Sequence, residues 1–254
     1  YGAVAQKRGI AIEGAEAAGH LQPGGTVVEY TAGTTGISLA LACAVRGYKL
    51  EIVFSDAFSD EKRRMMEAFG ARITDVPSDG KKITADLIKA MIAKAAELSQ
   101  RPGHWYCDQL NNTDASSGYR PLGEEIWAQT GGNVDAFVHA VGTAHAIHGA
   151  TQALWAHRPG IRIVAVEPAE SAVLSGGPSG SHQIEGIGIG FVPPLWAPEL
   201  VNEIQTVASG LGTLGALGAP GAAKSTSVAM STSRPQALQR AFQILPWSSS
   251  TLRL

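Results

Sequence analysis

The stretch of sequence that decides the fold is Val27-Val28-Glu29-Tyr30-Thr31-Ala32-Gly33-Thr34-Thr35-Gly36-Ile37-Ser38-Leu39-Ala40. It begins with a short apolar run typical of a strand and ends in the first turns of an apolar helix. A tight loop of Thr and Gly, residues 31–36, connects the two. Such a loop directs backbone N–H groups and hydroxyls at the positive end of a helix, where an anion binds well. From spacing alone, an anion site and an ordinary helix cap are equally good interpretations.

The alternation of apolar strand and helix continues along the chain on both sides of this stretch. Strands are predicted at 26–30, 50–54, 71–76, 105–107, 134–141 and 161–166, and helices at 10–19, 37–46, 59–69, 83–98, 119–130 and 146–157. This pattern favours an α/β fold in which helices cover both faces of a parallel sheet. Ligands of such sheets bind at the carboxyl ends of strands. Loops 31–36 and 142–146 fit that position best.

Composition excludes several classes of function. The chain has 254 residues, enough for one large or two smaller domains, and a formal net charge of -2. No attraction to nucleic acid or to a membrane surface is expected from that charge. No apolar run approaches the roughly 18 residues of a membrane span, and no leader suggests a signal peptide. The two cysteines, Cys43 and Cys107, indicate a reducing compartment, so a cytoplasmic location is expected.

Further polar and glycine-rich segments could carry chemistry. Residues 142–146 are either a phosphate cradle of backbone N–H groups or a plain turn between a strand and a helix. His145 and His148 lie three residues apart, but no third ligand has a fitting spacing, so no metal site is predicted. Segments 175–180 and 186–190 are dense in glycine, which marks flexible loops or a close backbone approach to a ligand.

Taken together, these segments resemble the cysteine synthase and cystathionine β-synthase family, which are pyridoxal-phosphate enzymes of fold type II. The resemblance preserves the order of the motifs and covers residues 12–208. The family's T-S-G-N-T-G loop matches residues 31–36, and its G-T-G-G-T phosphate loop lies at 142–146. The motif VEPAES-VLSGG is nearly verbatim at 166–177, and I-GIG-GFVP lies at 184–193.

The resemblance implies two three-layer αβα domains, similar to the tryptophan synthase β chain, with the cofactor cleft between them. The N-terminal domain would span residues 1–109 and carry the substrate carboxylate loop, with its first residues packing on the other domain. The C-terminal domain would span 110–254 and bind the phosphate of pyridoxal 5'-phosphate. Its sequence after about residue 209 is poorly specified. Members of the family are usually homodimers, so a homodimer is expected.

The resemblance also implies roles for individual residues. The cofactor would be bound by Thr34, Gly142, Thr143, Ala144, His145, Ala146 and Ser225. The amino-acid substrate would be bound by Thr31, Ala32, Gly33, Thr35, Gln109, Gly186 and Ile187. Lys7 is the candidate for the catalytic lysine that holds the cofactor as a Schiff base.

The sequence departs from the family pattern at four places. The family's lysine is expected near Val4, so either Lys7 is a surface lysine or part of the N-terminus is missing or altered, and we favour the second interpretation. Thr34 replaces an Asn that contacts the cofactor ring. The phosphate loop reads Gly-Thr-Ala-His-Ala, which lacks two glycines and the last hydroxyl, and His145 is a candidate to compensate as a cation or donor. The C-terminal serine segment is reduced to a remnant around Ser225.

The leading hypothesis for function is a β-replacement enzyme of amino-acid and cysteine biosynthesis, a transferase that converts O-acetylserine and sulfide to cysteine and acetate. One alternative keeps the cofactor but assigns a β-elimination or serine/threonine dehydratase reaction, which is lyase chemistry. A further alternative is a catalytically impaired relic without the lysine. The first two take a small amino acid as substrate, and none involves nucleic acid or a membrane.

Overall fold

The computed structural model describes residues 2–182, 184–209 and 227–230. Its first sheet has the strand order β3-β2-β1-β4, and all three pairings are parallel. The strands are β1 (Thr26–Tyr30), β2 (Lys49–Phe54), β3 (Arg72–Asp75) and β4 (His104–Tyr106). Because β1 lies in the middle of this sheet, the loop that follows it opens at the centre of the carboxyl edge.

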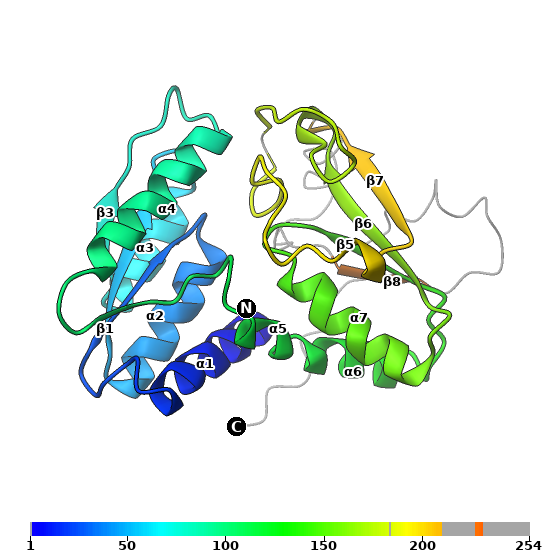
Figure 1. Cartoon of the computed structure of the whole chain (residues 1–254), viewed down its shortest axis with the longest axis horizontal. Helices are drawn as coiled ribbons and strands as arrows, with labels where there is room; N and C mark the ends of the chain where they lie inside the picture. Colours follow the sequence, from blue (N-terminus) through cyan, green and yellow to red (C-terminus); the bar gives the residue numbers. More distant parts are fainter. Residues whose placement is uncertain (1, 183, 210–226, 231–254) are drawn as a thin grey trace.

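Four helices accompany the first sheet: α1 (Gly2–Ala17), α2 (Thr34–Arg46), α3 (Asp60–Ala68) and α4 (Ala85–Ser99). Helix α4 packs against β1, β2 and β4, α2 packs against β1 and β2, and α1 packs on α2 (Figure 1). Helix α2 is close to α3 at Gly36, where a Cβ would lie 2.3 Å from the Met66 sulfur. The glycine at this position therefore allows the first turn of α2 to sit tightly on its neighbours.

The second sheet has the order β7-β6-β5-β8, in which β5, β6 and β7 are parallel and β8 is antiparallel to β5. Its strands are β5 (Ala136–Ala140), β6 (Arg162–Pro168), β7 (Glu203–Val207) and β8 (Ser227–Met230). The helices that precede or connect them are α5 (Asp114–Ser117), α6 (Arg120–Gln129), α7 (His145–His157), η1 (Ala169–Ser171) and η2 (Pro198–Leu200).

Each sheet has its own cluster of buried apolar side chains. One cluster is centred on Ile52, Phe54 and Leu39, and the other on Phe137, Ile163 and Leu154. Helix α1 contacts α5, so the start of the chain touches the segment that leads into the second sheet (Figure 1). Within the described residues, no helix is both long and apolar enough to cross a membrane.

The structure confirms the α/β class and corrects several element boundaries. Strand β1 coincides with the predicted 26–30, but α2 begins at Thr34 rather than at residue 37, and α1 begins at Gly2 rather than at residue 10. Strand β7 and the short helix α5 had not been predicted. The apolar periodicity misses the first turn of α2 because that turn consists of Thr, Thr and Gly, and it misses β7 because Gln205 and Thr206 are exposed.

Candidate functional site

Thr31 organises the loop between β1 and α2 through its own hydroxyl. Its Oγ1 accepts hydrogen bonds from the backbone N–H groups of Gly33 (2.9 Å) and Gly36 (3.2 Å), and its side chain is buried. Gly33 has φ 131°, a backbone conformation that residues other than glycine rarely adopt. Ala32 packs on the first core, and the carbonyl of Thr34 accepts from Ser38 Oγ. The half-buried Thr34 and Thr35 form the first turn of α2, at its positive end.

Gln109 joins this loop from a different part of the chain. Its side-chain oxygen accepts a hydrogen bond from Thr35 Oγ1 (3.0 Å), and its side-chain amide donates to the carbonyl of Tyr30 (2.7 Å). Its backbone N–H donates to the buried carboxylate of Glu29 (3.0 Å). Loop 31–36, which contains four of the predicted substrate residues, and Gln109 are therefore brought together, and Glu29 fixes the register between them.

Burial and charge also affect Tyr106, which ends β4 just before Gln109. Burial raises the pKa of its hydroxyl well above the usual range, and the negative charge of Glu29 raises that pKa further. The phenol therefore remains protonated at neutral pH. Sequence analysis had not assigned Glu29 a role, although a carboxylate within an otherwise apolar buried strand is a signal that could have found it.

His145 anchors the second loop, which follows β5. The imidazole is 1% exposed, its Nδ1 lies 2.8 Å from Thr143 Oγ1, and its Nε2 lies 3.0 Å from the carbonyl oxygen of Asn112. Because a carbonyl only accepts, Nε2 carries a proton and donates to Asn112. The ring thus ties the loop to residues 108–112, a structural contact that the expected role as a phosphate-binding cation did not include.

The remaining residues of the second loop form a compact start to α7. Ala144 has φ 67° in the left-handed region and is buried, and Ala146 lies half-buried in the first turn of the helix. The left-handed conformation costs an alanine roughly 1 kcal/mol relative to a glycine. Gly142 has no room for a side chain, since a Cβ there would lie 2.5 Å from the carbonyl oxygen of Gly186.

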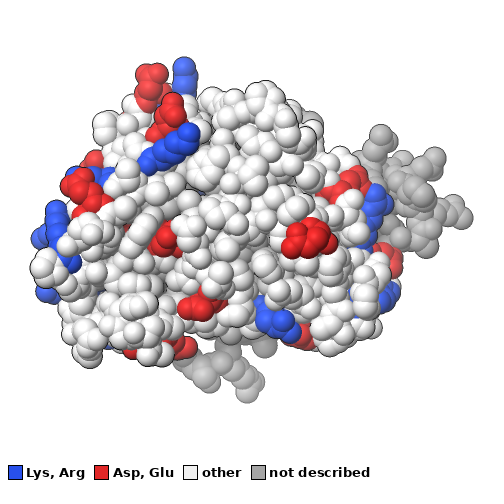
Figure 2. Space-filling model, viewed as in Figure 1, with Lys and Arg blue, Asp and Glu red and all other residues white. Residues whose placement is uncertain are grey.

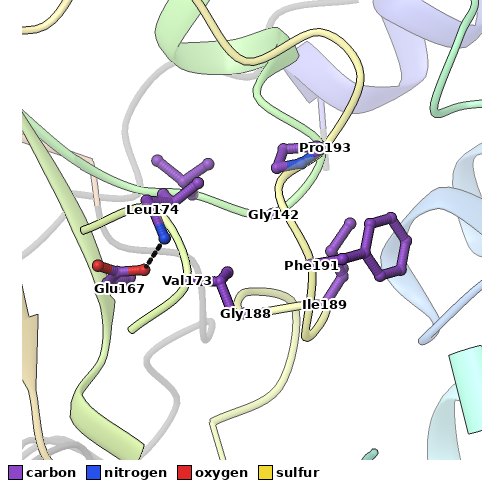
Figure 3. A pocket seen from close by; sticks show the side chains of 9 residues that line it. Gly142, Glu167, Val173, Leu174, Gly188, Ile189, Phe191 and Pro193 are labelled. Atoms are coloured by element: carbon purple, nitrogen blue, oxygen red, sulfur yellow. Dashed lines mark hydrogen bonds between the residues drawn. The ribbon is translucent and has the colours of Figure 1, made fainter. Parts of the chain in front are cut away.

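The segment that contains Gly186 and Ile187 closes against the second loop. The N–H of Gly188 donates to the carbonyl of Val141 (3.1 Å), and His182 Nε2 lies 2.6 Å from the carbonyl oxygen of Gly188. A small pocket lies between the ends of strands β5 and β6 and this glycine-rich segment (Figure 3). Its lining residues are Val141, Gly142, Glu167, Val173, Leu174, Gly188, Ile189, Phe191 and Pro193.

Glu167, near the end of β6, connects the two ends of segment 166–177 through hydrogen bonds to Leu174 and Ser175. Glu167 is 1% exposed, and its carboxylate accepts a hydrogen bond from the backbone N–H of Leu174 (2.7 Å; Figure 3). The carboxylate also accepts from the backbone N–H (2.9 Å) and the Oγ (2.5 Å) of Ser175. It therefore holds the turn that forms one wall of the pocket.

The contacts close into a ring of four segments. Loop 31–36 bonds to Gln109, residues 108–112 bond to His145, loop 142–146 packs on Gly186, and Glu185 pairs with Lys62, whose stem lies on Gly33. Lys62 and Glu185 are 123 positions apart in the chain, so local sequence patterns gave no signal for this last link.

Two predicted site residues have side chains that lie outside the described part of the structure. Ser225 lies outside the described residues. Lys7 lies within α1, but its side chain is not described. Among the described residues, no group of three or more His, Cys, Asp or Glu side chains is placed to hold a metal ion.

Comparison with known proteins shows which protein family has this fold and this arrangement of loops. The family model of pyridoxal-phosphate dependent enzymes matches residues 3–212. The chain belongs to this family, and its parallel sheet and its mostly parallel second sheet have the α/β architecture of fold type II.

The chain is also similar to individual members of the family. It is 37% identical over 198 residues to a cysteine synthase of Staphylococcus aureus, a match that covers 77% of this chain and 62% of the relative. The crystal structure of an O-acetylserine sulfhydrylase isoform of Entamoeba histolytica is 40% identical, with TM-score 0.71, and 82% of this chain covers 61% of it. A hydrogen sulfide-producing enzyme of Fusobacterium nucleatum is 30% identical, with TM-score 0.75, and 83% of this chain covers 70% of it. The chain thus spans less than two thirds of the first two.

Proposed function

We propose that this chain binds pyridoxal 5'-phosphate and an amino acid, and that its activity is that of a cysteine synthase, forming cysteine and acetate from O-acetylserine and sulfide. The observation that carries the proposal is the ring of contacts that unites residues 31–36, 108–112, 142–146 and 182–190. The cysteine synthase and O-acetylserine sulfhydrylase similarities support the choice of reaction.

The described residues fit the cofactor at the phosphate end. Gly142 lets the backbone of Gly186 pack directly against the second loop, which a side chain at this position would prevent. The 13-residue helix α7 begins at His145, so its N-terminus offers a positive partial charge to a phosphate. Residues 142–146 would hold the phosphate there. When bound, pyridoxal phosphate supplies an electron sink that stabilises negative charge at the substrate α-carbon.

The other residues would position the amino acid. Thr35 and the start of α2 would receive its carboxylate, and Gln109 would hold Thr35 in place through the bond to its Oγ1. Orienting the α-carbon in this way lowers the entropic cost of proton removal. Thr34 would contact the cofactor ring. Lys7 is our candidate for the catalytic lysine, Ser225 for a contact to the cofactor ring, and Gly186 and Ile187 for the facing side of the substrate site.

A β-elimination reaction is the second candidate function, because one structural relative is described as a hydrogen sulfide-producing enzyme.

We further propose a homodimer in the cytoplasm and a boundary between two domains near residues 109 and 110. Lys and Arg lie interspersed with Asp and Glu on the face seen in Figure 2, which fits a small-molecule substrate better than a nucleic acid.

Product analysis tests the choice between the two reactions. Purified protein supplied with pyridoxal phosphate, O-acetylserine and sulfide is expected to release cysteine, whereas cysteine or serine alone is expected to yield little keto acid. Keto acid as the main product would favour elimination, and neither product would refute both. Borohydride treatment followed by peptide mass spectrometry then identifies the lysine that binds the cofactor, and modification of any other lysine would exclude Lys7.

A further inference from the structure

Lys62 of α3 lies on the glycine of the carboxylate loop. A Cβ built at Gly33 would lie 2.2 Å from Lys62 Cδ and 3.1 Å from Lys62 Cβ, so the lysine stem fills the space that a side chain at position 33 would need. The ammonium group is only two bonds beyond Cδ. A positive charge is thus held directly beside the loop that leads into the N-terminus of α2.

Glu185 holds this ammonium from the other half of the chain. Lys62 Nζ lies 2.5 Å from Glu185 Oε2, and the two side chains are only 18% and 17% exposed. Charges buried to this extent are screened less by solvent and salt than a surface pair. Any ligand charge at the loop therefore interacts with both members, with opposite signs.

Closure of the segment around Glu185 does not depend on the ion pair alone. Ile83 and His182 form an antiparallel β-bridge, and Gly190 packs on Ala85 so closely that a Cβ there would lie 2.7 Å from the Ala85 Cβ. These two contacts hold the segment against the start of α4. The segment around Glu185 is thus held in place by other contacts, so the main effect of the ion pair is on the electrostatic potential at the loop.

We propose that Lys62 is a recognition residue for the carboxylate bound at residues 31–36, and that Glu185 is the counter-ion that limits its attraction. This deepens the proposed function, on which it rests for the role of the loop. If the pair acts through its charges, substitution of Lys62 weakens the binding of a carboxylate and substitution of Glu185 strengthens it. If the pair only holds the two segments together, both substitutions weaken binding.

The test compares the binding of L-serine with that of L-serinamide, which lacks the carboxylate charge. Calorimetric titrations are made with the protein loaded with pyridoxal phosphate and again without the cofactor. Lys62→Met is expected to weaken L-serine binding about tenfold, and Glu185→Gln to tighten it about threefold or more. L-Serinamide keeps the ammonium group but lacks the carboxylate charge, so it should neither bind more weakly to the Lys62→Met protein nor more tightly to the Glu185→Gln protein.

Three further variants control for structure. Lys62→Arg keeps the charge and should bind L-serine within about threefold of the wild type, and the double variant Lys62→Met/Glu185→Gln should also return close to it. Lys94→Met removes an exposed lysine that pairs with Glu97 on α4 and should leave binding unchanged.

A Glu185→Gln protein that binds L-serine no more tightly than the wild type, or a Lys62→Met protein that binds it equally well, would overturn the proposal. Failure of the proposed function is separate. It would show as an absence of product from O-acetylserine in the wild type, while the ratio of L-serine to L-serinamide affinity without cofactor still reports on Lys62.

Discussion

Replacement of Gly142 by alanine perturbs the closest approach between the two glycine-rich segments. The new Cβ would lie 2.5 Å from the carbonyl oxygen of Gly186, whereas an ordinary contact begins at 3.4 Å, so one backbone must retreat by about 0.9 Å. That movement acts on the hydrogen bond from Gly188 N–H to the Val141 carbonyl, which is 3.1 Å long.

The cost can be worked from these contacts. Overpacking costs about 1–3 kcal/mol, and loss of a backbone hydrogen bond adds about 1 kcal/mol. A total of about 2–4 kcal/mol corresponds to a fall of about 4–16 °C in the melting temperature for a chain of this size. Because the retreat opens the wall of the proposed phosphate site, the affinity for pyridoxal phosphate should fall as well.

Gly160→Ala is the matched control, because no atom lies within 4 Å of the Cβ that it would add. Melting is followed by calorimetry, and the opening of residues 186–188 by amide hydrogen exchange. The reasoning is refuted if the Gly142→Ala protein melts together with the control and exchanges the amides of 186–188 at the control's rate.

Three further predictions follow from the site and its surroundings. Gln109→Leu removes the bonds to Thr35 and Tyr30, so it should lower stability by about 1–3 kcal/mol in chemical denaturation and weaken L-serine binding; unchanged L-serine affinity would contradict the assigned role. Burial lowers the pKa of His139, whose ring stacks on Phe137, from 6.5 to about 4. The unfolded chain therefore binds a proton between those pH values that the folded chain does not, and stability should fall by about 1–3 kcal/mol on acidification from pH 6.5 to pH 4. His139→Gln should lose that part of the slope, and identical pH profiles would count against it. Burial and the neighbouring Cys107 raise the pKa of Cys43 to about 12, so iodoacetamide should modify Cys43 at pH 8 only after denaturation, as read by mass spectrometry.

The sequence contained enough local information to predict most of the elements. The run 26–30 coincides with β1, and the apolar positions of 146–157 place α7 within one residue of its observed start, because period and apolar content are local properties. The edge strand β7 escaped prediction because two of its five residues are exposed and it lacks a buried apolar run.

The candidate site could be predicted in its segments but not in its contacts. Residues 31–36 and 142–146 stand out by composition, and the structure brings both into one ring. The roles of Glu29 and of the Lys62–Glu185 pair arise from partners 80 and 123 positions away, which only tertiary packing reveals. The orientation of His145 toward Asn112, rather than toward a phosphate, likewise depends on how the loop at 108–112 folds.

The most direct test of the central claim is a comparison of how tightly the purified chain binds pyridoxal 5'-phosphate and pyridoxal, followed by the visible absorption of the bound cofactor. If residues 142–146 and the start of α7 form a phosphate site, the phosphorylated cofactor should bind at least about tenfold more tightly. Equal affinity for the two compounds, or binding of neither, would contradict the claim that these loops form a pyridoxal-phosphate site.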